Sequence, residues 1–154
     1  MKLFRSLAVI SIVAVLVLSF IHIQNKLALE RMISVDIHAD FLYMHSYLVQ
    51  SATTDWDDTR AIEDRIHSTG HKISMAAHVV ADSTYTLKEQ RALLHDLQQM
   101  LQHDVFQQRT PEHWRQLHDL LSQLGLTHEQ AGELSTDEAI AQLEQLVRVV
   151  RALN

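Results

Sequence analysis

The sequence predicts an all-α protein, in which an N-terminal transmembrane helix is followed by an antiparallel, up-and-down bundle of four to five helices. Three observations support this prediction. One stretch near the N-terminus is uncharged and long enough to cross a bilayer, the rest of the chain repeats apolar residues at spacings of three and four, and the 154 residues include only 3 Gly and 1 Pro. A β-sandwich or barrel needs a turn about every 8–12 residues, which so few turn-forming residues cannot supply.

Residues 6–25 form the predicted anchor. No Asp, Glu, Lys or Arg occurs from Ser6 to Asn25, and a helix of that length spans about 30 Å, the thickness of the hydrocarbon core of a bilayer. The stretch has no polar side, unlike a helix that covers a soluble core. Residues 1–5 are then a short tail, and residues 26–154 are the bundle domain.

A removable signal peptide is the alternative interpretation of this segment, because Val17-Leu18-Ser19 has small residues at the spacing of a cleavage site. The apolar run continues through Phe20, Ile21 and Ile23 with no turn-forming residue to end the helix. This continuation favours an anchor that is kept.

The basic residues on the two flanks of the anchor do not decide its orientation. Lys2 and Arg5 precede it, and Lys26 and Arg31 follow it, so the positive-inside comparison is a tie. Since a short N-terminal tail usually stays inside, we expect a single-pass protein of the inner or plasma membrane whose bundle is periplasmic or extracytoplasmic.

Five amphipathic segments are predicted beyond the membrane, and the first of them continues directly from the anchor. Each is apolar on one side only, so none is stable alone and they must pack together. Short connectors between them predict antiparallel neighbours. The segments are the continuation of the anchor to about Val49, then 55–80, 87–106, 111–124 and 135–150.

Two of these helices have clear start signals. Thr110 is a suitable N-cap ahead of Pro111 at the first helical position, and Gly125 fits the stop that follows that helix. Ser135 and Glu138 have the spacing of a capping box at the start of the last helix.

Composition excludes several functional classes. With no cysteine, the chain has no disulfide, thiolate metal ligand or cysteine nucleophile. Because 11 basic and 19 acidic residues follow the anchor, and no basic cluster occurs, nucleic acid is not an expected partner. No Gly-rich phosphate loop or nucleophile elbow is present. The adjacent residues His118 and Asp119 point about 100° apart on a helix, so we do not expect a dyad, and we predict that the chain is not an enzyme.

The sharpest local pattern is His67-x3-His71-x3-Met75-x2-His78. These four residues fall within about 80° of one another around a helix. Two imidazoles at i and i+4 can bind one metal ion, and a thioether adds affinity for copper(I). The candidate cofactor is therefore a divalent transition metal, Zn, Cu, Ni or Co, although no cofactor is certain.

His38 and His45 extend this hypothesis to the preceding helix. In an antiparallel hairpin that turns near Thr53, His38 lies level with His71, and His45 with His67, so all six residues could contribute to one inter-helix metal site. The alternatives are that the stripe, opposite the apolar face of its helix, only faces water, or that clustered imidazoles sense protons.

The segment Leu126-Thr127-His128-Glu129-Gln130 resembles the Leu-Thr-x-x-Gln motif of the Spy/CpxP-like periplasmic helical proteins. Proteins of that family act as chaperones and as stress or metal-response regulators. The resemblance covers five of 154 residues, and it assigns no functional role to any residue here.

Two functional classes follow from these patterns. The first is a membrane-anchored extracytoplasmic sensor or regulatory binding protein that responds to metal or pH through histidines. The second is a structural or assembly subunit that docks a membrane protein complex. In both cases we expect a protein partner or a homo-oligomer in addition to the membrane.

Overall fold

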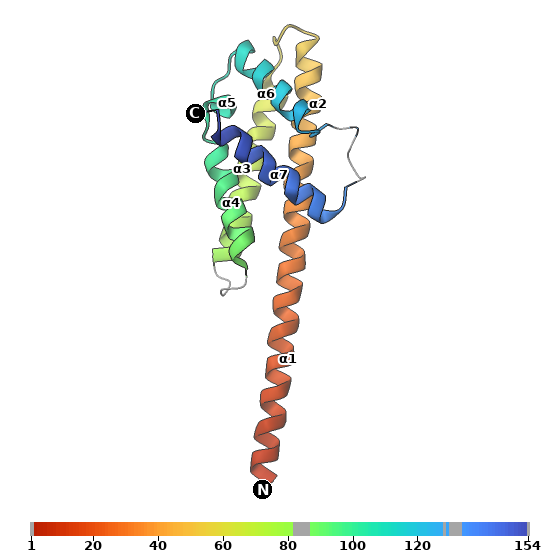
Figure 1. Ribbon diagram of the computed structural model, residues 1–154, viewed down its shortest axis with the longest axis vertical. Coiled ribbons are helices and arrows are strands. Elements are labelled where there is room, and N and C mark those ends of the chain that lie inside the picture. Colours follow the sequence, from red (N-terminus) through yellow and green to blue (C-terminus); the bar gives the residue numbers. More distant parts are fainter. Residues whose placement is uncertain (1, 82–86, 128, 130–133, 154) are drawn as a thin grey trace.

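The computed structural model describes residues 2–81, 87–127, 129 and 134–153, and the described chain is all-helical (Figure 1). A long N-terminal rod leads into a group of shorter helices. The elements are α1 (Lys2–Arg31), η1 (Met32–Ile37), α2 (His38–Ala52), α3 (Arg60–Ala81), α4 (Lys88–Met100), α5 (Asp104–Gln107), α6 (Pro111–Gln123) and α7 (Thr136–Arg151).

One unbroken helix links the apolar segment to the rest of the fold. Helix α1 continues through the π-helical turn η1 into α2, and in the described chain this is the one helix long and apolar enough to cross a membrane. From Ile10 to Ala28 its side chains are exposed except for the half-buried His22, and burial begins at Leu29. The apolar half of the helix therefore projects from the bundle (Figure 1).

Helices α2, α3 and α4 alternate in direction, whereas α6 and α7 lie obliquely across them (Figure 1). The register of α2 and α3 is fixed by Asp40, whose carboxylate is 1% exposed. Its oxygens lie 2.9 Å from Arg65 Nη1 and 2.8 Å from Lys72 Nζ, and they accept a hydrogen bond of 3.2 Å from Thr69 Oγ1. A buried carboxylate is tolerated when it is paired and hydrogen-bonded in this way. The level at which Asp40 meets Thr69 is the register predicted for the hairpin.

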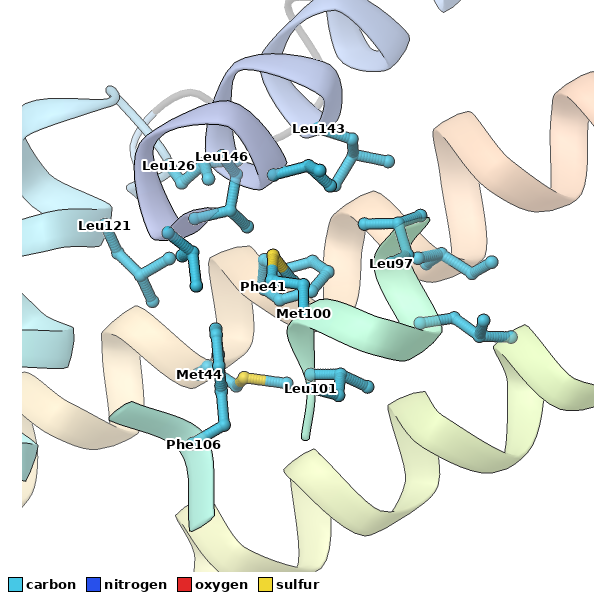
Figure 2. Close-up of a cluster of buried hydrophobic side chains, with 14 of the residues drawn as sticks. Phe41, Met44, Leu97, Met100, Leu101, Phe106, Leu121, Leu126, Leu143 and Leu146 are labelled. Atoms are coloured by element: carbon cyan, nitrogen blue, oxygen red, sulfur yellow. The ribbon is translucent and has the colours of Figure 1, made fainter. Parts of the chain in front are cut away.

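The core lies where α2 meets all the later helices. Figure 2 shows Phe41 and Met44 of α2 among leucines and methionines from α4, α6 and α7. Phe106 of α5 meets Phe41 edge to face, with ring centroids 6.4 Å apart, an arrangement that aromatic pairs prefer. The apolar stripe of the first predicted segment lies on η1 and α2 and is completely buried: Ile33, Ile37, Phe41, Met44 and Leu48.

Two predicted boundaries differ from the structure. The helix predicted over 87–106 ends at Met100, because His103 is extended and its Nδ1 accepts a hydrogen bond from Val105 N, which starts the separate helix α5. Helix α3 begins at Arg60 rather than near residue 55, because Asp55 and Trp56 have positive φ angles of 51° and 68°. The two start signals are confirmed: Thr110 Oγ1 accepts from His113 N, and Ser135 and Glu138 form the capping box.

Candidate functional site

The four residues of the predicted stripe on α3 all face outward. His67, His71, Met75 and His78 are exposed along one side of the helix, away from the buried face that includes Ile73. Since α3 is unbroken from Arg60 to Ala81, His67 and His71 lie one turn apart and are accessible. Such a pair can hold one Zn²⁺, Cu²⁺, Ni²⁺ or Co²⁺ ion through its imidazole nitrogens.

The structure does not bring His38 to this stripe. His38 is buried, and its Nε2 donates a hydrogen bond of 2.8 Å to Oε1 of Gln142 on α7. Burial lowers the pKa of His38, and the hydrogen bond to Gln142 opposes this effect only in part. His38 is therefore a neutral, hydrogen-bonded contact between α2 and α7.

His45 also faces another helix, α6, and there it forms a site with several other side chains. Its ring stacks on the ring of His118 of α6, with centroids 5.2 Å apart and planes 18° apart. The pair lines a cleft of about 420 Å³ that also includes Ser122, Thr127 and Glu129. Among the described residues, no three His, Asp or Glu side chains gather in an arrangement that could hold a metal ion. The six residues predicted to form one metal site therefore lie in three places: four on the outer side of α3, His38 at the contact of α2 with α7, and His45 in this cleft.

Hydrogen bonds define which ring nitrogens carry protons in the cleft. Ser122 Oγ donates its single proton to the carbonyl oxygen of His118 at 2.8 Å, so it can only accept from His45 Nε2, which lies 2.9 Å away. His118 Nδ1 lies 3.1 Å from Asp119 Oδ1, and a carboxylate accepts. In neutral His45, Nδ1 is therefore the nitrogen that can take up a further proton.

The environment of His45 disfavours that further proton. Burial lowers the pKa of His45, a charge on the neighbouring His118 lowers it further, and the Glu129 carboxylate acts in the opposite direction. A stack of two imidazoles with one lowered pKa is poorly suited to hold two positive charges.

His118 and Asp119 are adjacent on α6, and the Asp119 carboxylate gives His118 Nδ1 a partner within its own helix. The side chain of His118 is half-buried against His45, whereas that of Asp119 is exposed and can bend back to the adjacent ring. The expectation that the two residues form no catalytic dyad stays a prediction. Ser122 is the hydroxyl beside this contact, and its Oγ donates to the carbonyl oxygen of His118.

The sequence patterns predicted His45 as a site residue but paired it with the wrong neighbours. They did not predict its contact with His118. Spacing within one helix places residues on a face, but it does not say which distant helix covers that face. Of the segment that resembles the Leu-Thr-x-x-Gln motif, Thr127 and Glu129 line the cleft, while His128 and Gln130 lie outside the described residues.

Comparisons with protein-family models, with curated proteins and with solved structures find no match to this chain. The description of the protein therefore rests on its own fold and on this cleft. The part of the chain that the structure describes is all-helical, with one candidate membrane-spanning helix near the N-terminus and a histidine-lined cleft between α2 and α6.

Proposed function

We propose that this chain is a single-pass membrane protein whose antiparallel helical bundle lies outside the cytoplasm and acts as a sensor or regulatory protein that responds to acid. The observation that carries this proposal is that the apolar segment, His38 and His45 belong to one unbroken helix. A change in the packing of α2 against α6 or α7 would therefore act directly on the helix in the membrane. Its recipient would be a protein partner or a second copy of the chain.

The direction of the acid response follows from the two lowered pKa values. Burial holds the pKa of His38 and of His45 below the ordinary value of 6.5. Just below pH 6.5 the folded chain then binds fewer protons than the unfolded chain, so the free energy of unfolding decreases as the pH falls. This stabilisation is fully present above pH 6.5 and is lost as the pH falls through the folded-state pKa values.

The charged and titratable groups around the pair determine what protonation does. His118 of α6 repels a protonated His45, Glu129 attracts it, and Asp119 holds His118 Nδ1. His38 faces Gln142 of α7, whose Oε1 accepts a hydrogen bond from His38 Nε2. Protonation of His45 would place a charge against the ring of His118 and weaken the contact of α2 with α6, and protonation of His38 would place a charge inside the contact with α7.

Thermal unfolding of the full-length chain in phosphatidylcholine nanodiscs, followed by circular dichroism between pH 7.5 and 5.5, tests this proposal. We expect the unfolding midpoint to fall with pH in the unaltered chain and to depend much less on pH in the double variant His38→Gln/His45→Gln. The matched control is His67→Gln/His71→Gln, which removes two exposed histidines and should keep the pH dependence. A pH-independent midpoint in the unaltered chain, or a loss of the dependence in the control alone, would contradict the proposal.

A metal response would use the exposed pair on α3. The observation in its favour is that His67 and His71 are accessible and one turn apart on a continuous helix. Titration with zinc alone, measured calorimetrically, should give about one ion per chain in the unaltered protein and none in His67→Gln/His71→Gln. Equal zinc uptake by both proteins would remove this form of the proposal and leave the acid response intact.

A second candidate function is that of a structural or assembly subunit of a membrane complex. A cleft of about 440 Å³ lies where the apolar helix enters the bundle, lined by α1 and η1 residues that include Leu27, Ala28 and Met32. Such a surface would suit a helix of a partner protein. Co-purification with a membrane complex that is lost in Ala28→Trp, together with a pH-independent unfolding midpoint, would favour this function over a sensor.

A further inference from the structure

The end of the bundle formed by α3 and α4 is held at a defined height along α1. Gln90 Nε2 of α4 donates a hydrogen bond of 3.2 Å to Glu30 Oε1 of α1. Arg91 Nη2 donates one of 2.7 Å to the carbonyl oxygen of Val80 at the end of α3. The last turn of α3 and the first turns of α4 therefore lie beside residue 30 of the long helix, at the end of the bundle from which the apolar segment projects (Figure 1).

This height is close to the end of the apolar segment. Glu30 lies five residues beyond Asn25, which is about 7.5 Å along a helix. A bilayer with a hydrocarbon core of about 30 Å is about 40–45 Å thick with its headgroups, which leaves a headgroup layer of about 5–8 Å on each side. Transmembrane helices tilt by about 20° on average, and a tilt towards α3 would lower this end of the bundle further.

Large apolar side chains are exposed at this height and slightly farther from the membrane. Val79 is 62% and Met75 is 52% exposed on the outer side of α3, although Ile73, Ala76 and Val80 of the same helix are fully buried. From the register of Asp40 and Thr69, Val79 lies near the level of Glu30, and Met75 lies one turn farther out, near the level of η1, where Val35 is 53% exposed. Exposed apolar side chains are ordinarily scattered singly over a surface, whereas these three lie within about 8 Å of one another along the helix direction.

We propose that the C-terminal end of α3 rests, through Val79, in the headgroup layer of the bilayer that holds α1, with Met75 one helical turn farther from the membrane. This inference relies on the membrane anchor of the proposed function. The contact adds a second point of attachment, and two points fix the bundle's orientation on the membrane where a single helix would let it swing. The nearby charges are mixed, with Lys26 paired to Glu30 at 3.6 Å, so a zwitterionic lipid surface is sufficient.

Single-cysteine labelling tests the contact, because the native chain contains no cysteine. The variants Val79→Cys, Val49→Cys and Val17→Cys are each labelled with the same environment-sensitive fluorophore and reconstituted at full length in phosphatidylcholine vesicles. Phosphatidylcholine with a nitroxide on its headgroup then serves as the quencher for residues 79 and 49, and phosphatidylcholine with a nitroxide near the end of its acyl chain serves for residue 17, which lies close to the middle of the apolar segment. Val49 is the matched control, since it is an exposed valine of α2 near the opposite end of the bundle, and Val17 reports on the anchor.

We expect the label at residue 79 to be quenched at least threefold more than the label at residue 49. Equal quenching at 79 and 49, together with strong quenching at 17, would overturn the contact and leave the anchor in place. A label at 79 that is shielded from water but not quenched would mean that a second copy of the chain covers this surface, and it would also overturn the inference. No quenching at 17 would overturn the anchor and the inference with it.

Discussion

His45 of α2 lies flat against His118 of α6, with ring centroids 5.2 Å apart, at the edge of a cleft between the two helices. The two side chains come from helices that are distant in the sequence, and each has one ring nitrogen committed to a partner, Ser122 for His45 and Asp119 for His118. The remaining nitrogen of His45, Nδ1, is the one through which acid can act on the contact between α2 and α6.

Removing His118 should raise the pKa of His45. In the variant His118→Ala the repulsion from a charged neighbouring ring is lost, while the attraction of Glu129 stays. NMR titration of the His45 ring protons in the full-length chain, in detergent micelles, measures this change. The control His95→Ala removes an exposed histidine of α4. An unchanged His45 pKa in His118→Ala would mean that the two rings are not coupled.

Replacing Asp40 should destabilise the pairing of α2 with α3. Breaking a buried ion pair by removing one partner costs about 3–5 kcal/mol, and we expect Asp40→Ala to lie at the lower end of that range, because Arg65 and Lys72 are partly exposed and can turn towards water. Urea unfolding at pH 7.5 measures the loss. The exposed carboxylate of Asp64 provides the comparison, with a change of about 0.5 kcal/mol or less in Asp64→Ala. Similar values for the two variants would show that Asp40 does not hold the register.

Truncating Phe106 should leave a cavity beside Phe41. Phe106 is buried and meets that ring edge to face, and Phe→Ala changes in cores cost about 3–5 kcal/mol. We expect a loss of this size in Phe106→Ala, measured by the same urea titration. The neighbouring exposed residue gives the reference variant Gln108→Ala. A loss below about 1 kcal/mol would mean that α5 is a surface turn and no part of the core.

Local periodicity predicted most of the helices and their buried faces. Ile33, Ile37 and Phe41 recur at a spacing of four, and all are buried as the pattern requires. The start signals at Thr110 and Ser135 were equally readable, because a cap depends on residues within one turn of it. The exposed face of His67 and His71 also follows from their position opposite the apolar stripe.

The parts that sequence patterns missed depend on tertiary contacts. Helix α4 ends at Met100 because the extended His103 caps the separate helix α5, whose Phe106 packs on Phe41, and the apolar residues of 87–106 keep their helical spacing through this break. The π-helical turn at Met32–Ile37 lies where one helix passes from the apolar segment to the core, and its residues have ordinary helix spacing in the sequence. The partners of His38 and His45 were missed because α6 and α7 cross α2 obliquely, so hairpin register alone cannot place them (Figure 1).

The distance between α2 and α6 at low pH is the most direct test of the proposed acid response. Spin labels at Gln50→Cys and Gln116→Cys, two exposed positions on these helices outside the cleft, give the distance distribution between them by pulsed electron paramagnetic resonance in the full-length chain. We expect a longer and broader distribution of the distance between the labels at pH 5.5 than at pH 7.5, and a smaller change when His45→Gln is added. Superimposable distributions at the two pH values would contradict it.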